Sequence, residues 1–527
     1  MMPNPFSDTL FQLISSLEKS EKRHFKLYIK RSSAKEDLKI IRLFDALDKM
    51  PEYDEKVLLK KLTGVTKPQL YNLKTHLYKQ VLASLRLLKT TDNTDLKLSE
   101  HLDNARLLYN KGLKLQSLNI LEKAKDLAKA NHKFNFLVQV ISLEKKIETL
   151  HITRSTLEKT KILAEEADEI SGHIYRVTRL SNLALLLYRW YVKNGHARNE
   201  EDEKDIKQFF KNSLPEDPHA INGFYEKLYL FQSFSWYAFI RQDFLMYYRY
   251  SQKWINLFTD NEVMYAVETG HYIKGMHNLL NAHFVLRNFK QFKITLHQFE
   301  EFAKKPEANL HDNFRTHTSI YINSARINQF IMQGDFNKGL SIVAEVECKL
   351  KEYSLYVDSH RIMVFNYKIA TLYFGAAQYS TAIDFLHKII NDTQTGLRND
   401  LQCYARLMHL LCHYELGNEE ILDSLIKSVY RFMARMKNLT VVEEEMFKFL
   451  RYSSKVNAKQ LKPELEKFLQ KIKHLEKNRF ETRSFAYLDI ISWVESKVFD
   501  IPMEEVINNK YKKNIDKKIE PSYAISA

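Results

Sequence analysis

Glycine and proline are scarce in this chain, which contains 12 glycines and 10 prolines among its 527 residues. Average proteins contain roughly 7% glycine and 5% proline. Because these two residues supply the backbone conformations that tight turns need, their shortage excludes a β-sandwich, barrel or propeller. The prolines are also bunched, with none between Pro68 and Pro215 or between Pro306 and Pro463. We therefore predict an all-α chain of long helices with few breaks.

Cysteines and long apolar runs are also rare. The three cysteines, Cys348, Cys403 and Cys412, are too few for a disulfide framework, which indicates a reducing compartment. No run approaches the roughly 18 apolar residues that a membrane span needs, and the N-terminal residues lack the pattern of an export signal. We expect a cytoplasmic protein without a membrane span.

The motifs of nucleotide and nucleophile chemistry are missing from the sequence. Two glycine pairs, beginning at Gly270 and Gly334, have phosphate-loop spacing, but neither is followed by the required Lys-Ser/Thr. No GxGxxG or GxSxG string occurs, and no Ser/His/Asp or Cys/His set has a local signature. We expect a protein that is not an enzyme and that needs no cofactor.

One cluster has the spacing of metal ligands. His409 and His413 lie four residues apart beside Cys412, and Cys403 precedes them by about two turns. This spacing places two imidazoles on one helical face, as in some zinc sites. However, no glutamate stands at the HExxH position, and the repeat described below places most of these residues at helix contacts. We interpret the cluster as packing and expect no metal site.

Acidic residues are absent from Lys56 to Thr91. The net charge of the chain is +15, and this window supplies over half of it through eight basic residues: Lys56, Lys60, Lys61, Lys67, Lys74, Lys79, Arg86 and Lys89. Basic clusters attract phosphate-rich polymers, anionic lipids or acidic protein surfaces. A second cluster, from Lys510 to Lys518, lies near the C-terminus.

The acid-free window has the outline of a helix-turn-helix at residues 56–85. Lys56–Leu62 reads as a short helix, and Gly64 suits the turn that follows it. Thr66 is placed to cap a second helix that has Pro68 in its first turn. Two interpretations stay open: a surface for nucleic acid or another polyanion, and a structural cap with a basic solvated face.

A repeat runs through the second half of the chain. Five polar turn strings each stand between two apolar segments and precede a residue that begins the next helix: Phe244, Phe289, Phe336, Tyr379 and Glu419. The intervals are 45, 47, 43 and 40 residues. Two helices per unit at such a period indicate stacked helical hairpins, because one hairpin cannot bury its own apolar face.

These units resemble the tetratricopeptide repeats (TPR). In the unit 367–386, Ala370 and Ala382 match the small residues of the family's two helices, and Tyr373 matches its first aromatic. The resemblance covers residues 228–430. It departs from the family in longer units, a missing terminal proline and missing small residues around Phe244 and Phe289. The resemblance implies a right-handed α-solenoid.

The resemblance also implies a concave groove lined by polar positions of each first helix. Carried over by position, these are Gln232, Trp236, His277, Asn281, Ser324, Asn328, Tyr367 and Thr371. Their amide, hydroxyl and aromatic groups suit a peptide backbone better than a bare phosphate. The alternative is that they are ordinary residues of a helix surface.

The sequence therefore predicts six regions. They are an N-terminal basic helical domain (1–95), divergent hairpins (96–193), a linker or long loop rich in acids and prolines (194–220), TPR-like repeats (221–435), C-terminal helices (436–507) and a basic flexible tail (508–527). We expect a scaffold or regulator that binds a protein or peptide partner in its groove. The alternative is a nucleic-acid-binding regulator that uses residues 56–89, with the repeats as an effector or dimerisation domain.

Overall fold

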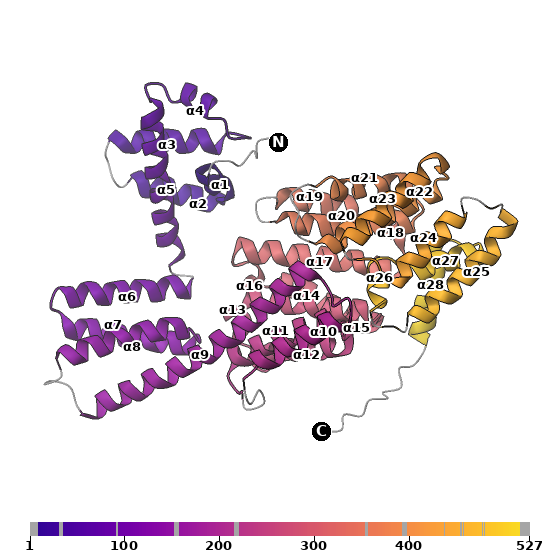
Figure 1. Cartoon of the computed structure of the whole chain (residues 1–527). Coiled ribbons are helices and arrows are strands. Elements are labelled where there is room, and N and C mark those ends of the chain that lie inside the picture. The colour runs from indigo at the N-terminus through magenta and orange to yellow at the C-terminus, as the bar shows by residue number, and fades with distance from the viewer. Residues whose placement is uncertain are drawn as a thin grey trace. The chain divides into compact units, whose positions relative to one another are not determined.

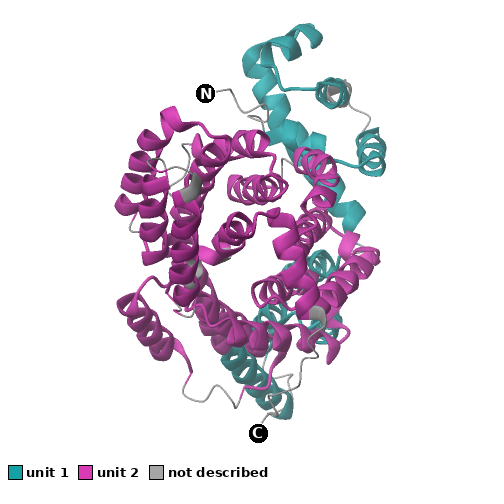
Figure 2. Cartoon of the chain, turned by 90° about the vertical axis from the view of Figure 1, so that its right-hand side faces the viewer, with its two compact units in different colours: residues 1–174 teal, residues 175–527 magenta. Residues whose placement is uncertain are grey.

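The computed structural model describes residues 9–30, 35–90, 93–151, 157–215, 221–353, 357–392, 398–436, 438–453, 456, 458–476, 478 and 480–516. All regular elements in these residues are helices, and none is a β-strand, which confirms the predicted all-α class (Figure 1). Among the described residues, no helix combines the length and apolar character that crossing a membrane requires. The chain divides into two compact units, residues 1–174 and 175–527 (Figure 2).

The first unit has two separate hydrophobic cores. One lies among the first five helices and includes Phe25 and Phe44, whose ring centroids are 4.7 Å apart; the other includes Leu121 and Val140. The helices are α1 (Thr9–Ser16), α2 (Lys19–Lys30), α3 (Lys35–Asp48), α4 (Glu55–Lys61), α5 (Lys67–Lys89), α6 (Thr94–Asn110), α7 (Lys114–Ala130), α8 (Phe134–Leu150) and α9 (Leu157–Asn194), which continues into the second unit.

The predicted helix-turn-helix segment folds as two helices joined by a short turn, α4 and α5. Gly64 in this turn has φ +83°, the left-handed conformation expected for it. Thr66 and Gln69 form a capping box at the start of α5, and Pro68 lies in its first turn. Leu70, Leu77 and Val81 bury one face of α5 in the first core.

The second unit contains helical hairpins that pack in series. Its helices after α9 are α10 (Glu200–Ser213), α11 (Phe224–Ile240), α12 (Phe244–Thr259), α13 (Met264–Val267), α14 (Thr269–Val285), α15 (Phe289–Ala303), α16 (Pro306–Asn309), α17 (Asp312–Gln333), α18 (Phe336–Leu340), α19 (Val343–Glu352), α20 (Ser359–Gly375), α21 (Tyr379–Ile390), α22 (Asn399–Glu415), α23 (Glu419–Arg435), α24 (Val441–Ser453), α25 (Ala458–Leu475), α26 (Thr482–Tyr487), α27 (Ile490–Phe499) and α28 (Met503–Asp516). Helix α12 contacts α14, α15 contacts α17, and α21 contacts α22, so each hairpin packs on the next.

The five predicted turn strings all connect the helices of a hairpin. Helices α12, α15, α18, α21 and α23 begin at the five residues that the sequence marked, which confirms the hairpin boundaries. In each turn one residue has a positive φ: Gln242, Arg287, Gly334, Ala377 and Gly417. At Gly334, for example, Asp335 N donates to Phe330 O at 3.1 Å, which closes the helix end in a Schellman motif.

The segment 194–220, which we expected to be a linker or long loop, contains helix α10. Its acidic run is the first turn of that helix, where carboxylates interact favourably with the helix dipole, and Asn199 caps the end. Ile206 and Phe210 are buried, and the Phe210 ring stacks on Tyr237 with centroids 4.0 Å apart. The segment therefore belongs to the second unit, except for residues 216–220, which lie outside the described residues.

The C-terminal helix α28 packs back onto the hairpins of the second unit. Helix α28 contacts α15 and α17, Asn508 Nδ2 donates to Gln333 O at 3.1 Å, and the Tyr511 ring meets Phe289 edge-on at 4.7 Å. The prediction of a flexible tail from residue 508 is therefore wrong up to Asp516, because this stretch is helical and packed. Lys517 and Lys518 of the second basic cluster lie outside the described residues.

Candidate functional site

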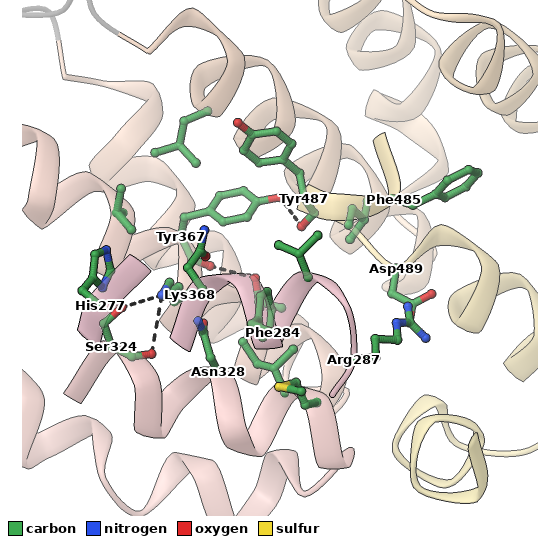
Figure 3. A pocket seen from close by; sticks show the side chains of 18 of the residues that line it. His277, Phe284, Arg287, Ser324, Asn328, Tyr367, Lys368, Phe485, Tyr487 and Asp489 are labelled. Atoms are coloured by element: carbon green, nitrogen blue, oxygen red, sulfur yellow. Dashed lines mark hydrogen bonds and ion pairs between the residues drawn. The ribbon is translucent and has the colours of Figure 1, made fainter. Parts of the chain in front are cut away.

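A cavity of about 680 Å³ lies inside the second unit (Figure 3). Seven of the eight predicted groove residues line it: Trp236 from α11, His277 and Asn281 from α14, Ser324 and Asn328 from α17, and Tyr367 and Thr371 from α20. The four-residue spacing within each helix keeps each pair on one face, and stacking of the hairpins brings the faces together. The structure thus collects residues up to 135 positions apart around one space.

Gln232 is the predicted groove residue that does not line the cavity. Its side chain is buried, and its Nε2 lies 3.0 Å from His271 Nδ1 on α14. The amide is therefore used in the contact between α11 and α14, one turn before the position where Trp236 reaches the cavity.

Aromatic rings form one wall of the cavity. The His277 ring stacks on Tyr321 of α17 with centroids 4.0 Å apart and an interplanar angle of 12°. The His317 ring is also nearly parallel to Tyr321, with centroids 6.0 Å apart. Trp236 and Tyr188 lie 4.7 Å apart by ring centroid. Such a wall offers flat apolar surface together with polar edges.

Six cations of the described residues also line the cavity, and the sequence analysis did not place them there. Three of them are Lys274 on α14 and Arg361 and Lys368 on α20, and the others are Arg287, Arg398 and Lys510. Lys368 Nζ donates to Ser324 Oγ at 2.5 Å (Figure 3). Arg361 Nη1 lies 2.8 Å from His317 Nε2. The signal was available, because Lys274 lies one turn before His277 on α14, and Lys368 lies next to Tyr367 and one turn before Thr371 on α20.

Burial and neighbouring charges lower the pKa values of several groups that line the cavity. Burial lowers the pKa of Lys368 to about 7. Burial also lowers the pKa of His277 to about 3, and the nearby charges of Lys368, Arg361 and Lys274 add to that effect. Lys274 itself has a lowered pKa because of burial and the charge of Arg361. The His277 ring therefore stays neutral at neutral pH.

The C-terminal segment supplies another wall of the cavity, which the sequence analysis also missed. Asp489 lies beside Arg287 and accepts from its Nη2 at 3.4 Å (Figure 3). It also accepts from Ser492 Oγ at 2.7 Å. Burial would raise the pKa of Asp489, but the charges of Arg287 and Lys510 and the bonds from Ser492 hold it below its usual value. The carboxylate of Asp489 thus has hydrogen-bond partners on both sides and links Arg287 to the segment after α26.

Tyr487 is the second anchor of the C-terminal segment. Tyr367 Oη donates to Tyr487 O at 3.0 Å, and the Tyr487 ring stacks on Tyr404 with centroids 4.4 Å apart. The Tyr487 hydroxyl donates to Asp400 and accepts from Arg398. The hydroxyl of Tyr367, which we predicted to bind a partner, is therefore hydrogen-bonded to this segment.

The predicted polyanion patch is partly exposed and partly paired. Six of its members are exposed: Lys56, Lys60, Lys61, Lys67, Lys79 and Arg86. Lys67 lies 3.1 Å from Glu55, and Lys89 lies 3.1 Å from Glu21. Lys74 donates to Tyr53 Oη at 2.9 Å, so its ammonium serves a contact inside the first unit.

The His/Cys cluster sits at helix contacts, as the sequence interpretation had it. Cys403 and Cys412 are buried in the large core of the second unit, and His409 Nε2 lies 3.0 Å from His387 Nε2 on α21. Among the described residues, no three His, Cys, Asp or Glu side chains are arranged to hold a metal ion.

Comparison of the chain with protein-family models and with curated proteins finds no match.

Proposed function

We propose that the second unit is a TPR-like, right-handed α-solenoid whose cavity binds a peptide segment of a protein partner, as a non-enzymatic scaffold or regulator. The observation that supports this most is that the repeat register picks out residues of four helices, and seven of the eight line one cavity. A volume of about 680 Å³ accommodates a few side chains rather than a folded domain.

The chemistry of the lining suits an extended peptide. Asn281, Ser324, Asn328 and Thr371 carry amide and hydroxyl groups that donate to and accept from a peptide backbone. The His277–Tyr321 stack and Trp236 provide flat surfaces on which apolar or aromatic side chains pack. Distributed contacts of this kind are typical of peptide recognition by helical repeats.

Site-specific photo-crosslinking in host cells tests this proposal. A photoreactive benzoylphenylalanine replaces Thr371, which lines the cavity, and in a matched control it replaces Ser380, which is exposed on α21. We expect a discrete crosslinked protein from the Thr371 position and its loss when Asn281 and Asn328 are both changed to Leu. Crosslinks that are equal at both positions, or that ignore the Asn changes, would refute the proposal.

A second candidate function, nucleic-acid binding, is favoured by the start of α5. Lys67, Asn72 and His76 are exposed on its first turns, directly after the glycine turn. Side chains of these types read base edges and phosphates when the second helix of a helix-turn-helix enters a major groove. The lysines of α4 would then lie beside the phosphate backbone.

Salt-dependent binding separates this candidate from a structural cap. In fluorescence anisotropy with a labelled DNA duplex, log affinity should fall linearly with log salt, and replacing both Lys60 and Lys61 by Ala should reduce the slope by about 2. Lys74→Met is the matched control, because that ammonium already bonds Tyr53. Absence of binding at low salt, or an effect of Lys74→Met equal to that of the double change, would exclude the candidate.

A further inference from the structure

Two half-buried lysines of the cavity have no counterion among the described residues. Lys274 lies over the rings of Tyr188 and Trp236 at 5.1 and 5.8 Å, and Lys368 bonds the neutral Ser324. Within the described part of the chain, no carboxylate lies within 4.0 Å of either ammonium. Burying a charge without a partner is costly, so protein interiors avoid it where no function requires it.

The other cations of the cavity each lie close to a carboxylate. Arg398 lies 2.9 Å from Asp400, and Lys510 lies 2.6 Å from Glu495. Arg287 lies 3.4 Å from Asp489. Among the described residues, the carboxylate paired with Arg361 is that of Asp358, at 3.9 Å, whose side chain is 58% exposed. The unbalanced positive charge is therefore concentrated on Lys274, Lys368 and Arg361.

These three residues line one cavity from α14 and α20, both of which contact α17. Arg361 contacts His317 and lies 5.8 Å over the Tyr321 ring of α17, on which His277 stacks, and Lys368 bonds Ser324 of α17. The Tyr321 and His277 rings form the surface between α14 and α20 at which the cations gather. Ammonium and guanidinium groups around a water-accessible hollow are the donors that carboxylate and phosphate oxygens require.

We propose that Lys274, Arg361 and Lys368 form an oxyanion site that binds a carboxylate or phosphate group carried by the partner peptide. This inference rests on the proposed function, and it names the chemistry of the bound segment as acidic. The anion supplies the missing counterion, Arg361 and Lys274 contact its oxygens from one side, and Lys368 contacts them from the side of Ser324. The polar groups of Asn281 and Asn328 remain for the peptide backbone.

A random peptide library displayed on phage probes the site on the full chain. Three proteins are compared: wild type, Lys368→Met in the cavity, and the matched control Lys290→Met, which is exposed on α15 and does not line the cavity. We expect wild type and Lys290→Met to enrich peptides with Asp, Glu or a free terminal carboxylate, and Lys368→Met to lose that enrichment.

Synthetic versions of the enriched peptide then distinguish the two sources of oxyanion. Replacing its carboxylate by the amide should weaken binding to wild type by tenfold or more, and binding to Lys368→Met by little, because the pair is already broken. A phosphoserine version that binds more tightly than the carboxylate version identifies phosphate as the better ligand. The reverse order identifies carboxylate.

The outcomes also separate this inference from the proposed function. Enriched peptides without acids that bind Lys368→Met as tightly as wild type overturn the oxyanion site and leave the peptide groove standing. If wild type selects no peptide, the groove proposal fails, and inorganic phosphate alone decides the site. A rise in melting temperature with phosphate over chloride at equal ionic strength, absent in Lys368→Met, supports it, and no such rise overturns it.

Discussion

Lys368→Met should make the second unit more stable at neutral pH, although it removes a polar residue and its hydrogen bond. Burial lowers the pKa of Lys368 from 10.5 to about 7. At pH 7 the folded chain must either hold a buried charge or release its proton, and linkage puts this cost on the order of 4 kcal/mol. The hydrogen bond to Ser324 offsets about 1–2 kcal/mol of it. Methionine has similar length and carries neither cost, so a net gain of about 2 kcal/mol is expected.

The pH dependence makes this prediction specific to the charge. Between pH 7 and 10.5 the unfolded chain holds the proton more tightly than the folded chain, so raising the pH stabilises the wild type. The burial cost falls to about 2 kcal/mol at pH 9, and the advantage of Met should shrink by about 2 kcal/mol between pH 7 and pH 9. Below pH 7 the difference between the two proteins should stay constant.

Tryptophan fluorescence during urea unfolding measures the stability of the second unit, which contains Lys368. The four tryptophans, Trp190, Trp236, Trp254 and Trp493, all lie in the second unit. Lys290→Met, on the exposed face of α15, should change the unfolding free energy by less than about 0.5 kcal/mol at either pH. A Lys368→Met protein that is less stable at pH 7, or a difference that does not change with pH, would refute the reasoning.

Three further predictions concern the turns and the acid response. Gly334→Ala should lower the free energy of unfolding in urea by about 1–3 kcal/mol more than Gly417→Ala. Both glycines have a positive φ, but a Cβ at position 334 would lie 2.7 Å from Glu504 O on α28, whereas nothing lies within 4 Å of a Cβ at position 417. Equal losses would contradict the packing of α28. Ala377→Gly should stabilise by about 0.5–1 kcal/mol in the same assay, because Ala377 has φ +57° and relief of that strain exceeds the added freedom of the unfolded chain. His277→Gln should reduce the loss of stability between pH 6.5 and pH 4 by up to about 1.4 kcal/mol per pH unit. The histidine takes up a proton in the unfolded chain but not in the folded chain, where its pKa is about 3. An unchanged dependence of stability on acid pH would show that other groups control it.

The sequence predicted those features that depend on local patterns. The hairpin turns were found because five polar strings interrupt apolar helices at a near-constant interval, and a helix begins directly after each one. The groove residues were carried over by position from the resemblance to tetratricopeptide repeats. Gln232 was placed on the right helix but one turn too early, where His271 takes its amide.

The missed features depend on contacts that no local pattern encodes. The acidic run Glu200–Glu203 reads as a solvated linker until Phe210 is seen to stack on Tyr237. The pairing state of Lys274 and Lys368 could not be predicted, because a lysine on a helix looks the same with or without a carboxylate opposite. Asp489 and Tyr487 lie far along the chain from Arg287 and Tyr367, with which they close the cavity.

The packing of α28 against α17 sets an order on how the cavity is made during translation. Gln333 and Tyr511, which bond at 3.3 Å, are separated by 178 residues. Synthesis at roughly 5–20 residues per second leaves α17 outside the ribosome for about ten seconds or more before α28 follows it. During that time the inner faces of α14, α17 and α20 lack the wall that Asp489 and Lys510 later provide. A nascent chain therefore exposes the inner faces of these helices before the C-terminal segment covers them.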